Sequence, residues 1–341
     1  MSSVPLRLAL KNTAMKTLRS AGVYSIAAKS GRRKNRLLIL CYHGISVSDE
    51  HEWLGFLFIS PERFRQRLAC LRDAKANVLP LGEALNRLEN GSLPERSVAI
   101  TFDDGFHDFQ QHAVPLLNEF GFPCTLYLTT YYSGLPFPII NLALDYLLWK
   151  CGRETVTVPE ATGAGTATMP LRTWMDRQQA KMAFLAYFES KGMSTAAKND
   201  FARSIAEQFG VDYDALLKSR FGQILTPEEA VQVARSGIDI QLHTHRHRTS
   251  LDRELFLREL RDNSSRIQEI TRKTPHHFCY PSGRYERDFL PWLREFGVIS
   301  ATTCERGFAL PSSDPLLLPR VLDDSNMDPV EFEGVVSGLF A

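Results

Sequence analysis

The sequence lacks several features that would assign it to a specialised class of protein. It has no apolar run long enough to span a bilayer. The apolar stretches nearest its start, 6–10 and 23–28, are too short for a spanning helix. With 23% charged residues and a formal net charge of +1, it shows neither a basic excess nor an acidic tail. No internal repeat indicates a solenoid. The composition therefore predicts an ordinary globular protein with no nucleic-acid partner.

Cysteine pairs with metal-binding or redox spacing are also absent. The six cysteines are scattered, none forms a C-x-x-C pair, and several stand in apolar, strand-like runs where a thiol packs as a small hydrophobic side chain. We interpret them as reduced and buried, which favours a cytoplasmic protein. The even number leaves a disulfide-bonded form as the alternative.

The amino-terminal 36 residues contain nine Lys or Arg residues and no acid. A secretory signal fits poorly, because Lys11, Lys16 and Arg19 interrupt the apolar part and the densest basic cluster, Arg32–Lys34, comes after it. We predict a basic helical segment over residues 1–35. It either makes peripheral contact with an anionic membrane surface or packs its apolar stripe on the rest of the protein.

From Arg36 onward, short apolar runs alternate with amphipathic stretches, which is the pattern of βα units around a parallel sheet. Residues 131–222 break this alternation with a short β-like run at 155–158, a Gly/Ala/Thr-rich part at 161–168 and helix-like stretches after it. We therefore expect the barrel to be built from residues 36–130 and 223–341, with a helical insertion or cap over 131–222. The strands are expected at 37–42, 78–81, 97–102, 124–129, 238–242, 277–280, 298–303 and 316–321.

Two groups of polar residues directly follow two of these strands. Asp103 and Asp104 come after the run 97–102, and His243–His247, which holds three histidines, follows the run 238–242. The carboxyl ends of parallel strands meet at one rim of a barrel, where barrel enzymes hold their catalytic groups. Two imidazoles and a carboxylate with open positions for water form a hydrolytic metal site. A helix N-cap and a polar loop are the alternatives for the two groups.

The two groups carry a family resemblance. Thr101-Phe102-Asp103-Asp104-Gly105 resembles the first signature of the polysaccharide deacetylase, or NodB homology, family, which is carbohydrate esterase family four. His243-Thr244-x-x-His247 resembles the second signature, and Phe278-Cys279-Tyr280-Pro281-Ser282-Gly283 resembles the third. The similarity of spacing covers the chain from about Leu37 to Val321 apart from the insertion. The resemblance implies an α/β fold, a distorted (β/α)7 barrel of the NodB type with a helical insertion.

The resemblance also implies a ligand set and a base. A divalent metal, zinc in the first place and cobalt or nickel otherwise, would be held by Asp104, His243 and His247. Asp103 is then left as the general base that takes a proton from the attacking water. His245 lies between the two histidine ligands in the chain. It is expected either to orient a ligand without binding the metal or to be structural.

The third signature implies contacts with the substrate. The backbone N–H of Ser282 would complete the oxyanion hole, at a position where family members commonly carry tyrosine. Tyr280 and Pro281 would line the substrate-binding site. The remaining histidines are expected at the surface or on helices, namely His107, His112, His276 and His277.

Two residues common in the family have no counterpart at the usual place. Thr274 stands where many members carry an arginine that orients the base; Arg320 could supply this charge, or could be a surface arginine. No histidine follows His277, although the usual general acid is a histidine near the last strand. His43, at the end of the first strand, is the candidate acid, with a metal-bound water and a purely structural histidine as alternatives.

The function implied is metal-dependent removal of acetyl groups, in the first place N-acetyl, from an amino sugar in a polysaccharide or lipid-linked glycan. The partner would be an acetylated glycan, and the protein would be cytoplasmic or associated with the membrane through its basic amino terminus. Two alternatives stay open: a non-acetyl amidohydrolase on the same fold, and a catalytically weak carbohydrate-binding relative. The missing arginine and histidine favour the second alternative, whereas retention of both metal signatures argues against it.

Overall fold

The computed structural model describes residues 13–162 and 165–340. The chain divides into two compact units. The first combines Met1–Ser133 with Leu225–Ala341, and the second is Gly134–Ile224. The expected helical segment at the amino terminus falls partly outside the described residues, which begin at Thr13.

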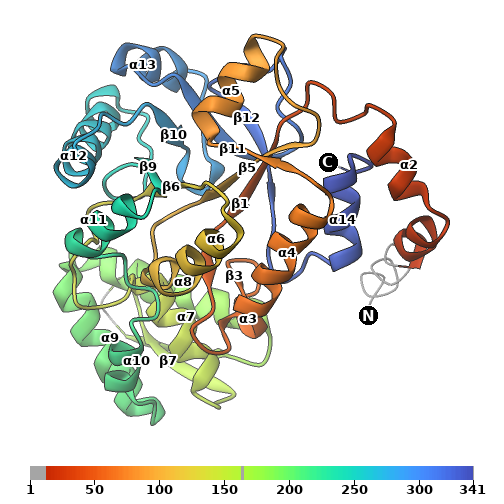
Figure 1. Ribbon diagram of the computed structural model, residues 1–341. Coiled ribbons are helices and arrows are strands. Elements are labelled where there is room, and N and C mark those ends of the chain that lie inside the picture. Colours follow the sequence, from red (N-terminus) through yellow and green to blue (C-terminus); the bar gives the residue numbers. More distant parts are fainter. Residues whose placement is uncertain (1–12, 163–164, 341) are drawn as a thin grey trace. The chain divides into compact units, whose positions relative to one another are not determined.

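A closed parallel barrel forms the centre of the first unit (Figure 1). Its strands follow the order β1-β12-β11-β10-β9-β6-β5, and β5 pairs with β1 to close the sheet. The predicted (β/α)7 barrel is thereby confirmed. The seven strands are β1 (Leu38–Tyr42), β5 (Ser97–Phe102), β6 (Thr125–Leu128), β9 (Asp239–Leu242), β10 (His277–Cys279), β11 (Ser300–Arg306) and β12 (Leu318–Leu322).

Helices follow most of the barrel strands and cover the outside of the barrel (Figure 1). Their starts follow local chemistry: the Ser60 side chain accepts a hydrogen bond from the Arg63 N–H at the start of α4, and Thr226 and Glu229 form a capping box on α11. The helices of this unit whose two ends both lie in the described part of the chain are α2 (Val23–Lys29), α3 (Glu50–Trp53), α4 (Pro61–Asp73), α5 (Leu81–Glu89), the π-helical η1 (Phe109–Ala113), α6 (Val114–Phe120), α11 (Pro227–Arg235), α12 (Arg253–Thr271), the 3-10 turn η2 (Pro281–Gly283), α13 (Phe289–Phe296) and α14 (Pro329–Ser337).

The expected strand over 78–81 is wrong after its first residue. Strand β4 covers only Asn77–Val78 and pairs with β5, and Leu81 already begins α5. Pro80 has no N–H to donate to a ladder and precedes the helix with φ −54° and ψ 140°, so the strand cannot continue through it. A short parallel pair that no pattern indicated joins β2 (Gly44–Ile45) to β3 (Phe58–Ile59).

The second unit contains the expected helices and also a hairpin. Strands β7 and β8 pair in antiparallel register, although the Gly/Ala/Thr-rich part of the sequence indicated no second strand. Val156 and Val158 of β7 are buried and alternate with exposed residues, which confirms the β-like run expected at 155–158. The elements of this unit are α7 (Ile140–Lys150), β7 (Thr155–Pro159), β8 (Thr166–Pro170), α8 (Trp174–Ser190), α9 (Thr195–Phe209) and α10 (Tyr213–Ser219).

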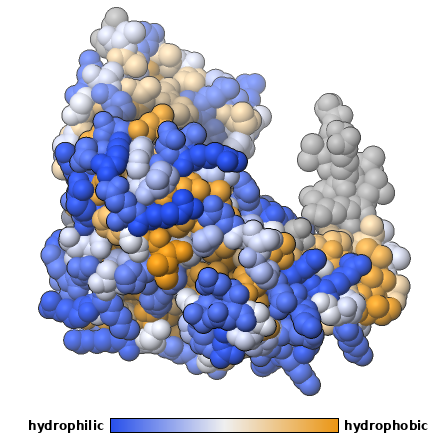
Figure 2. Space-filling model, turned by 90° about the horizontal axis from the view of Figure 1, so that it is seen from above, coloured by the Kyte–Doolittle hydropathy of each residue, from blue (hydrophilic) through white to orange (hydrophobic). Residues whose placement is uncertain are grey.

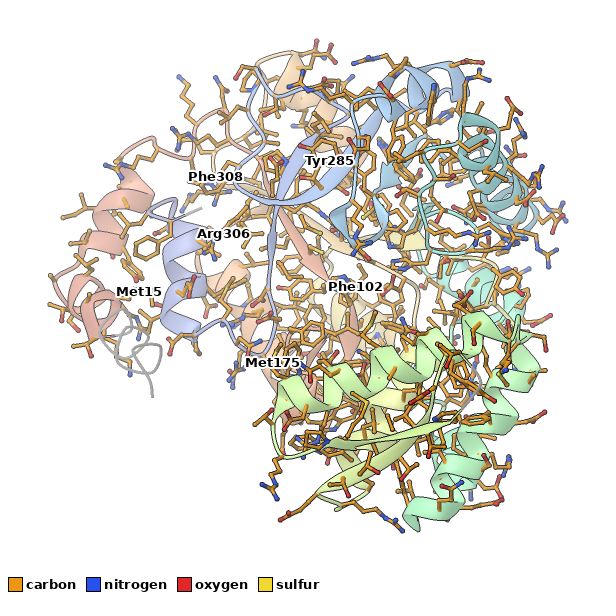
Figure 3. The ribbon with its side chains drawn as sticks, turned by 180° about the vertical axis from the view of Figure 1, so that it is seen from behind. Met15, Phe102, Met175, Tyr285, Arg306 and Phe308 are labelled. Atoms are coloured by element: carbon orange, nitrogen blue, oxygen red, sulfur yellow. The ribbon has the colours of Figure 1, made fainter. Side chains whose placement is uncertain are left out.

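One residue of the basic amino-terminal cluster is a buried anchor. Arg33 is only 2% exposed, and its guanidinium donates hydrogen bonds to the carbonyl oxygens of Val336 (2.8 Å) and Ser97 (2.7 Å). It also lies over the ring of Phe308, which is labelled in Figure 3. Arg33 thus ties the segment after α2 to β5 and α14, so it is not part of a solvated basic patch.

Among the described residues, every helix is too short or too polar to traverse a bilayer.

Candidate active site

The carboxyl end of β5 presents two adjacent carboxylates at the rim of the barrel. Phe102, the last residue of β5 and labelled in Figure 3, contacts Phe64 of α4 on the helical side of the sheet. Asp103 and Asp104 follow directly, and both are buried. Burying two neighbouring carboxylates is unfavourable unless each one has a compensating charge or a metal, so the partners of each side chain decide what the site can do.

Several residues around these carboxylates have strained backbone. Asp104 (φ 70°), Thr244 (φ 61°), His247 (φ 54°) and Ser282 (φ 56°) all adopt the left-handed conformation that L-residues other than glycine disfavour. Such conformations persist where the surrounding structure enforces them, and they gather at functional sites. At Gly105 (φ 86°) a Cβ would lie 2.3 Å from a neighbouring leucine side chain, so only glycine fits the turn after the carboxylates.

Asp103 is held by a bidentate salt bridge. Both Arg320 terminal nitrogens donate to the Asp103 carboxylate, Nη1 to Oδ1 and Nη2 to Oδ2, each at 2.7 Å, and Arg320 is itself 1% exposed. Burial alone would raise the pKa of Asp103, but the charge and hydrogen bonds of Arg320 outweigh it and hold that pKa well below its usual range. Asp103 therefore remains an ionised carboxylate. Because Arg320 is buried, its reading as a surface arginine is wrong.

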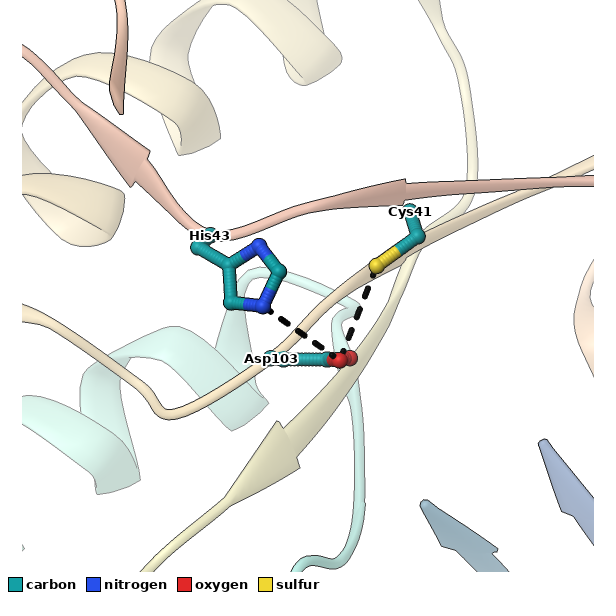
Figure 4. Close-up of side chains that lie close together, drawn as sticks. All are labelled: Cys41, His43 and Asp103. Carbon is teal, nitrogen blue, oxygen red and sulfur yellow. Dashed lines mark hydrogen bonds and ion pairs between the residues drawn. The ribbon is translucent and has the colours of Figure 1, made fainter. Parts of the chain in front are cut away.

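Two thiols and one imidazole complete the surroundings of Asp103. The Cys279 Sγ atom lies 3.3 Å from Asp103 Oδ2. Cys41 Sγ and His43 Nε2 lie 3.6 Å and 3.8 Å from the same oxygen (Figure 4). Burial raises the pKa of both thiols well above the usual range, so the thiols stay protonated and can donate to the carboxylate. Burial also lowers the pKa of His43, which favours its neutral form.

Asp104 faces the two histidines of the second signature. Its Oδ1 atom lies 3.2 Å from His243 Nε2 and 3.1 Å from His247 Nε2. His243 Nδ1 lies 2.9 Å from the Cys279 carbonyl oxygen, which can only accept, so Nδ1 carries the proton and Nε2 presents a lone pair. The buried Oδ1 atom of Asp104 has no hydrogen-bond donor among the described residues. Acceptor atoms that converge without a donor fit a divalent cation, and these three side chains offer one ligand atom each within 4.8 Å of one another.

Helix α12 supports the loop that carries both histidines. The Asn263 side chain is fully buried; its Oδ1 accepts a hydrogen bond from the His243 N–H (2.9 Å), and its Nδ2 donates to the Leu128 carbonyl oxygen (2.9 Å). One turn earlier, the buried Glu259 carboxylate accepts from the Arg246 N–H at 2.7 Å. The sequence analysis predicts a role for neither Glu259 nor Asn263. The one pattern that points to them is their spacing of four residues, which puts two polar side chains on the buried face of the helix.

The third signature is arranged differently from the prediction. Tyr280 has no exposed surface and its hydroxyl donates to the Leu316 carbonyl oxygen, while Pro281 is also buried. Neither side chain is therefore open to a ligand: the Tyr280 ring packs against the rings of Phe278 and Tyr285, with centroids 5.0 Å and 5.5 Å apart, which corrects the predicted contact of these side chains with substrate. Ser282 is exposed in the turn η2, where its backbone remains available.

The other histidines lie outside the cluster. His245 Nδ1 is 2.9 Å from Thr130 Oγ1, on the side of the loop away from Asp104. His277 was expected at the surface but is buried, with Nδ1 2.8 Å from Ser300 Oγ, because it begins β10 inside the sheet. Thr274, where an arginine is common in the family, is exposed.

An ionised buried carboxylate beside an Asp-His-His set at the rim of an α/β barrel defines a candidate metal-dependent hydrolytic centre. Comparison with known proteins gives the family. The family model for polysaccharide deacetylase matches residues 90–147 and 172–300, more than half of the chain. The chain belongs to the polysaccharide deacetylase family.

Curated relatives match over a shorter part. The poly-β-1,6-N-acetyl-D-glucosamine N-deacetylase of Staphylococcus epidermidis is 29% identical over 111 residues, which is 30% of this chain and 38% of the relative. The Staphylococcus aureus protein of the same name is 32% identical over 112 residues, covering 30% of this chain and 39% of the relative. The chain thus matches less than two fifths of the length of these relatives.

Solved structures show the same fold over most of the chain. The deacetylase PplD of Streptococcus pyogenes, solved in complex with acetate, aligns with a TM-score of 0.57 at 19% identity, over 87% of this chain and 96% of that one. IcaB from Ammonifex degensii aligns with a TM-score of 0.56 at 18% identity, over 90% and 97%. These similarities establish the NodB-type barrel.

Proposed function

We propose that this protein is a metal-dependent hydrolase that removes acetyl groups, in the first place N-acetyl groups, from an amino sugar of a polysaccharide or a lipid-linked glycan. The observation that carries the proposal is that the two carboxylates after β5 have different partners. Asp103 is ionised and paired with Arg320, as a base requires, whereas Asp104 faces His243 and His247, as a metal ligand requires. Membership in the polysaccharide deacetylase family and the N-deacetylase names of the staphylococcal relatives support the choice of an acetylated amino sugar.

Asp104, His243 and His247 would hold the metal, with zinc as the first choice for these imidazole and carboxylate ligands and cobalt or nickel as alternatives. When bound, such an ion polarises the acetyl carbonyl and acidifies a water molecule. Asp103 accepts a proton from the attacking water, since Arg320 keeps its carboxylate ionised. The exposed turn at Ser282 offers its backbone N–H to the developing oxyanion.

His43 is proposed to return the proton to the leaving amine. It is the imidazole nearest the base, with Nε2 3.8 Å from Asp103 Oδ2, and burial favours its neutral form, which can accept the proton from Asp103 and pass it on. An amine is a poor leaving group without a proton, whereas a phenolate leaves readily. His43→Gln should therefore reduce hydrolysis of N-acetyl sugars by at least about a hundredfold and barely change hydrolysis of an aryl acetate. Equal losses on both substrates would remove His43 from this role.

The location follows as a further part of the proposal. The thiols of Cys41 and Cys279 donate to the Asp103 carboxylate, and oxidation of either thiol would remove that hydrogen bond. These contacts support a cytoplasmic, reducing compartment. The amino-terminal segment leaves Ile26 (67% exposed) beside exposed basic residues such as Lys29, and hydrophobic residues gather at this edge of the barrel unit in Figure 2. Exposed apolar side chains beside basic ones are what a peripheral contact with an anionic membrane requires, and we propose such a contact for this segment.

The decisive experiment measures acetate release from N-acetylglucosamine oligomers and acetylated polysaccharides. The full chain is stripped with chelator and reloaded with zinc, cobalt or nickel. The proposal expects release that depends on added metal and disappears in Asp103→Asn. If the protein binds one metal ion but releases no acetate from any acetylated sugar, and instead hydrolyses formyl amides or cyclic imides, the acetyl assignment is wrong. If it hydrolyses none of these and binds the oligomers, the protein is a carbohydrate-binding relative.

A further inference from the structure

Three arginines line one cavity in the loop between β9 and α12. The cavity has a volume of about 400 Å³, and its walls include Arg246, Arg248 and Arg258 together with Thr249 and Ser250. All of these residues belong to the barrel unit, and Arg248 and Arg258 are exposed. None of the three arginines has a part in the hydrolytic centre as described above.

The charges around the cavity do not cancel. Glu259 is the one carboxylate among the lining residues, and it is committed to Arg246, whose N–H and guanidinium donate to it at 2.7 Å and 3.0 Å. Arg248 reaches the same carboxylate only through a long contact of 3.4 Å, with most of its side chain in solvent. No ion pair involves Arg258 in the part of the chain that the structure describes. Two guanidinium groups therefore remain available to a ligand.

Acidic residues near the cavity are also occupied. Asp252 caps α12 by accepting from the Leu255 N–H, and Glu254 pairs with Arg253 at 2.9 Å. The potential over the cavity is thus set by its arginines and by the amino-terminal end of a 19-residue helix, both of which favour an anion.

The cavity adjoins the candidate metal ligands. Arg246 and Arg248 flank His247, whose Nε2 atom lies 3.1 Å from Asp104 Oδ1. Neighbouring residues are about 3.8 Å apart along the backbone, so the arginine-lined cavity is built on the same short loop that carries a candidate metal ligand. The guanidinium of Arg246 also lies 5.0 Å from the ring centroid of the partly exposed Tyr131.

We propose that this cavity is a subsite for a phosphate ester carried by the glycan next to the acetylated sugar. The inference rests on the proposed function and narrows its substrate to phosphate-bearing glycans. A guanidinium fork binds two oxygens, so a single carboxylate is satisfied by one arginine, whereas the oxygens of a phosphate can accept from several. Arginine is also the side chain whose planar donors best match phosphate. The polymer named for the staphylococcal relatives, poly-β-1,6-N-acetyl-D-glucosamine, carries no such group.

The test uses Arg248→Gln/Arg258→Gln in the full chain, with Arg253→Gln/Arg261→Gln as the control. The control removes the same charge from the same helix region, but both of its arginines already face Glu254. Binding of inorganic phosphate and of N-acetylglucosamine 1-phosphate is measured by calorimetry on the metal-loaded protein. Turnover is measured on neutral, phosphate-bearing and uronic-acid-bearing N-acetylglucosamine oligomers.

The proposal expects the double variant to weaken phosphate binding and to lower kcat/KM on phosphate-bearing oligomers by about tenfold or more, because charged hydrogen bonds are lost. Turnover of neutral oligomers should stay within about twofold of the wild type, and the control should leave all values unchanged. Calorimetry tests the subsite independently of deacetylation: phosphate binding without turnover of any oligomer would refute the proposed function but keep the subsite.

Three outcomes overturn the inference. The first is equal phosphate binding by wild type and double variant. The second is a preference for uronic-acid over phosphate-bearing oligomers that depends on Arg248 and Arg258, which would assign the cavity to a carboxylate. The third is arginine-dependent binding to phosphatidylglycerol vesicles without any discrimination among soluble oligomers, which would make the loop a membrane contact.

Discussion

Removing the charge of Arg320 should change both the stability of the barrel and the pH response of Asp103. Arg320 and Asp103 are almost fully buried and joined by two hydrogen bonds of 2.7 Å. Truncating one partner of a buried pair leaves the other charge uncompensated and costs about 3–5 kcal/mol. Arg320→Met, which keeps much of the aliphatic volume, should therefore lower the free energy of unfolding by about this amount. Urea titration of the full chain would measure it.

The pH dependence gives a sharper signature. In the wild type, the pKa of Asp103 lies below that of the unfolded chain, so the contribution of the pair is present above about pH 4 and is lost as the pH falls. In Arg320→Met, burial without a partner raises the pKa of Asp103, so the folded variant retains a proton that the unfolded chain releases. The variant should then lose stability as the pH rises above about 4, and the acidic limb of its activity should move to higher pH.

Arg67 offers a matched control. Its guanidinium pairs with the buried Asp323 at 3.0 Å and donates to the Met327 carbonyl oxygen, and none of its hydrogen bonds within the described part of the chain goes to a residue of the proposed centre. Arg67→Met should destabilise the fold to a similar degree without moving the acidic limb of activity. The double variant Arg320→Met/Asp103→Asn should be more stable than Arg320→Met, because no buried charge remains. The reasoning is refuted if Arg320→Met unfolds at the wild-type urea concentration, or if its activity profile shifts no more than that of Arg67→Met.

Further variants separate the roles of the site. Asp103→Asn should lower kcat by about a hundredfold or more while zinc affinity, measured by chelator competition, stays within a few-fold; a large loss of affinity would make Asp103 a ligand. His243→Ala should weaken zinc binding by more than about a hundredfold, and unchanged affinity would exclude His243 from the metal site. Asn263→Ala should weaken zinc binding by about tenfold to a hundredfold, since the His243 N–H loses its acceptor; unaltered affinity would show that α12 does not position the loop.

The sequence determined the frame of the site. Buried strands followed at once by Asp103-Asp104 and by His243–His247 indicated that these side chains gather at the carboxyl rim of a parallel barrel, and the structure places Asp104 Oδ1 within 3.2 Å of both Nε2 atoms. Such information is local: a strand is recognised from the period of its apolar residues, and its last residue fixes which side chains reach the rim.

The tertiary structure alone decided the partners of these residues. Arg320 could be a surface side chain or the partner of Asp103 until closure of the barrel through β1 brought β12 close to β5. Burial of Tyr280 and support of His243 by Asn263 likewise depend on residues that lie 36 and 20 positions away along the chain. Contacts across such separations depend on strand register and barrel closure, which local periodicity does not specify. For that reason the sequence could name the candidate ligands, while only the fold shows which residues hold them in place.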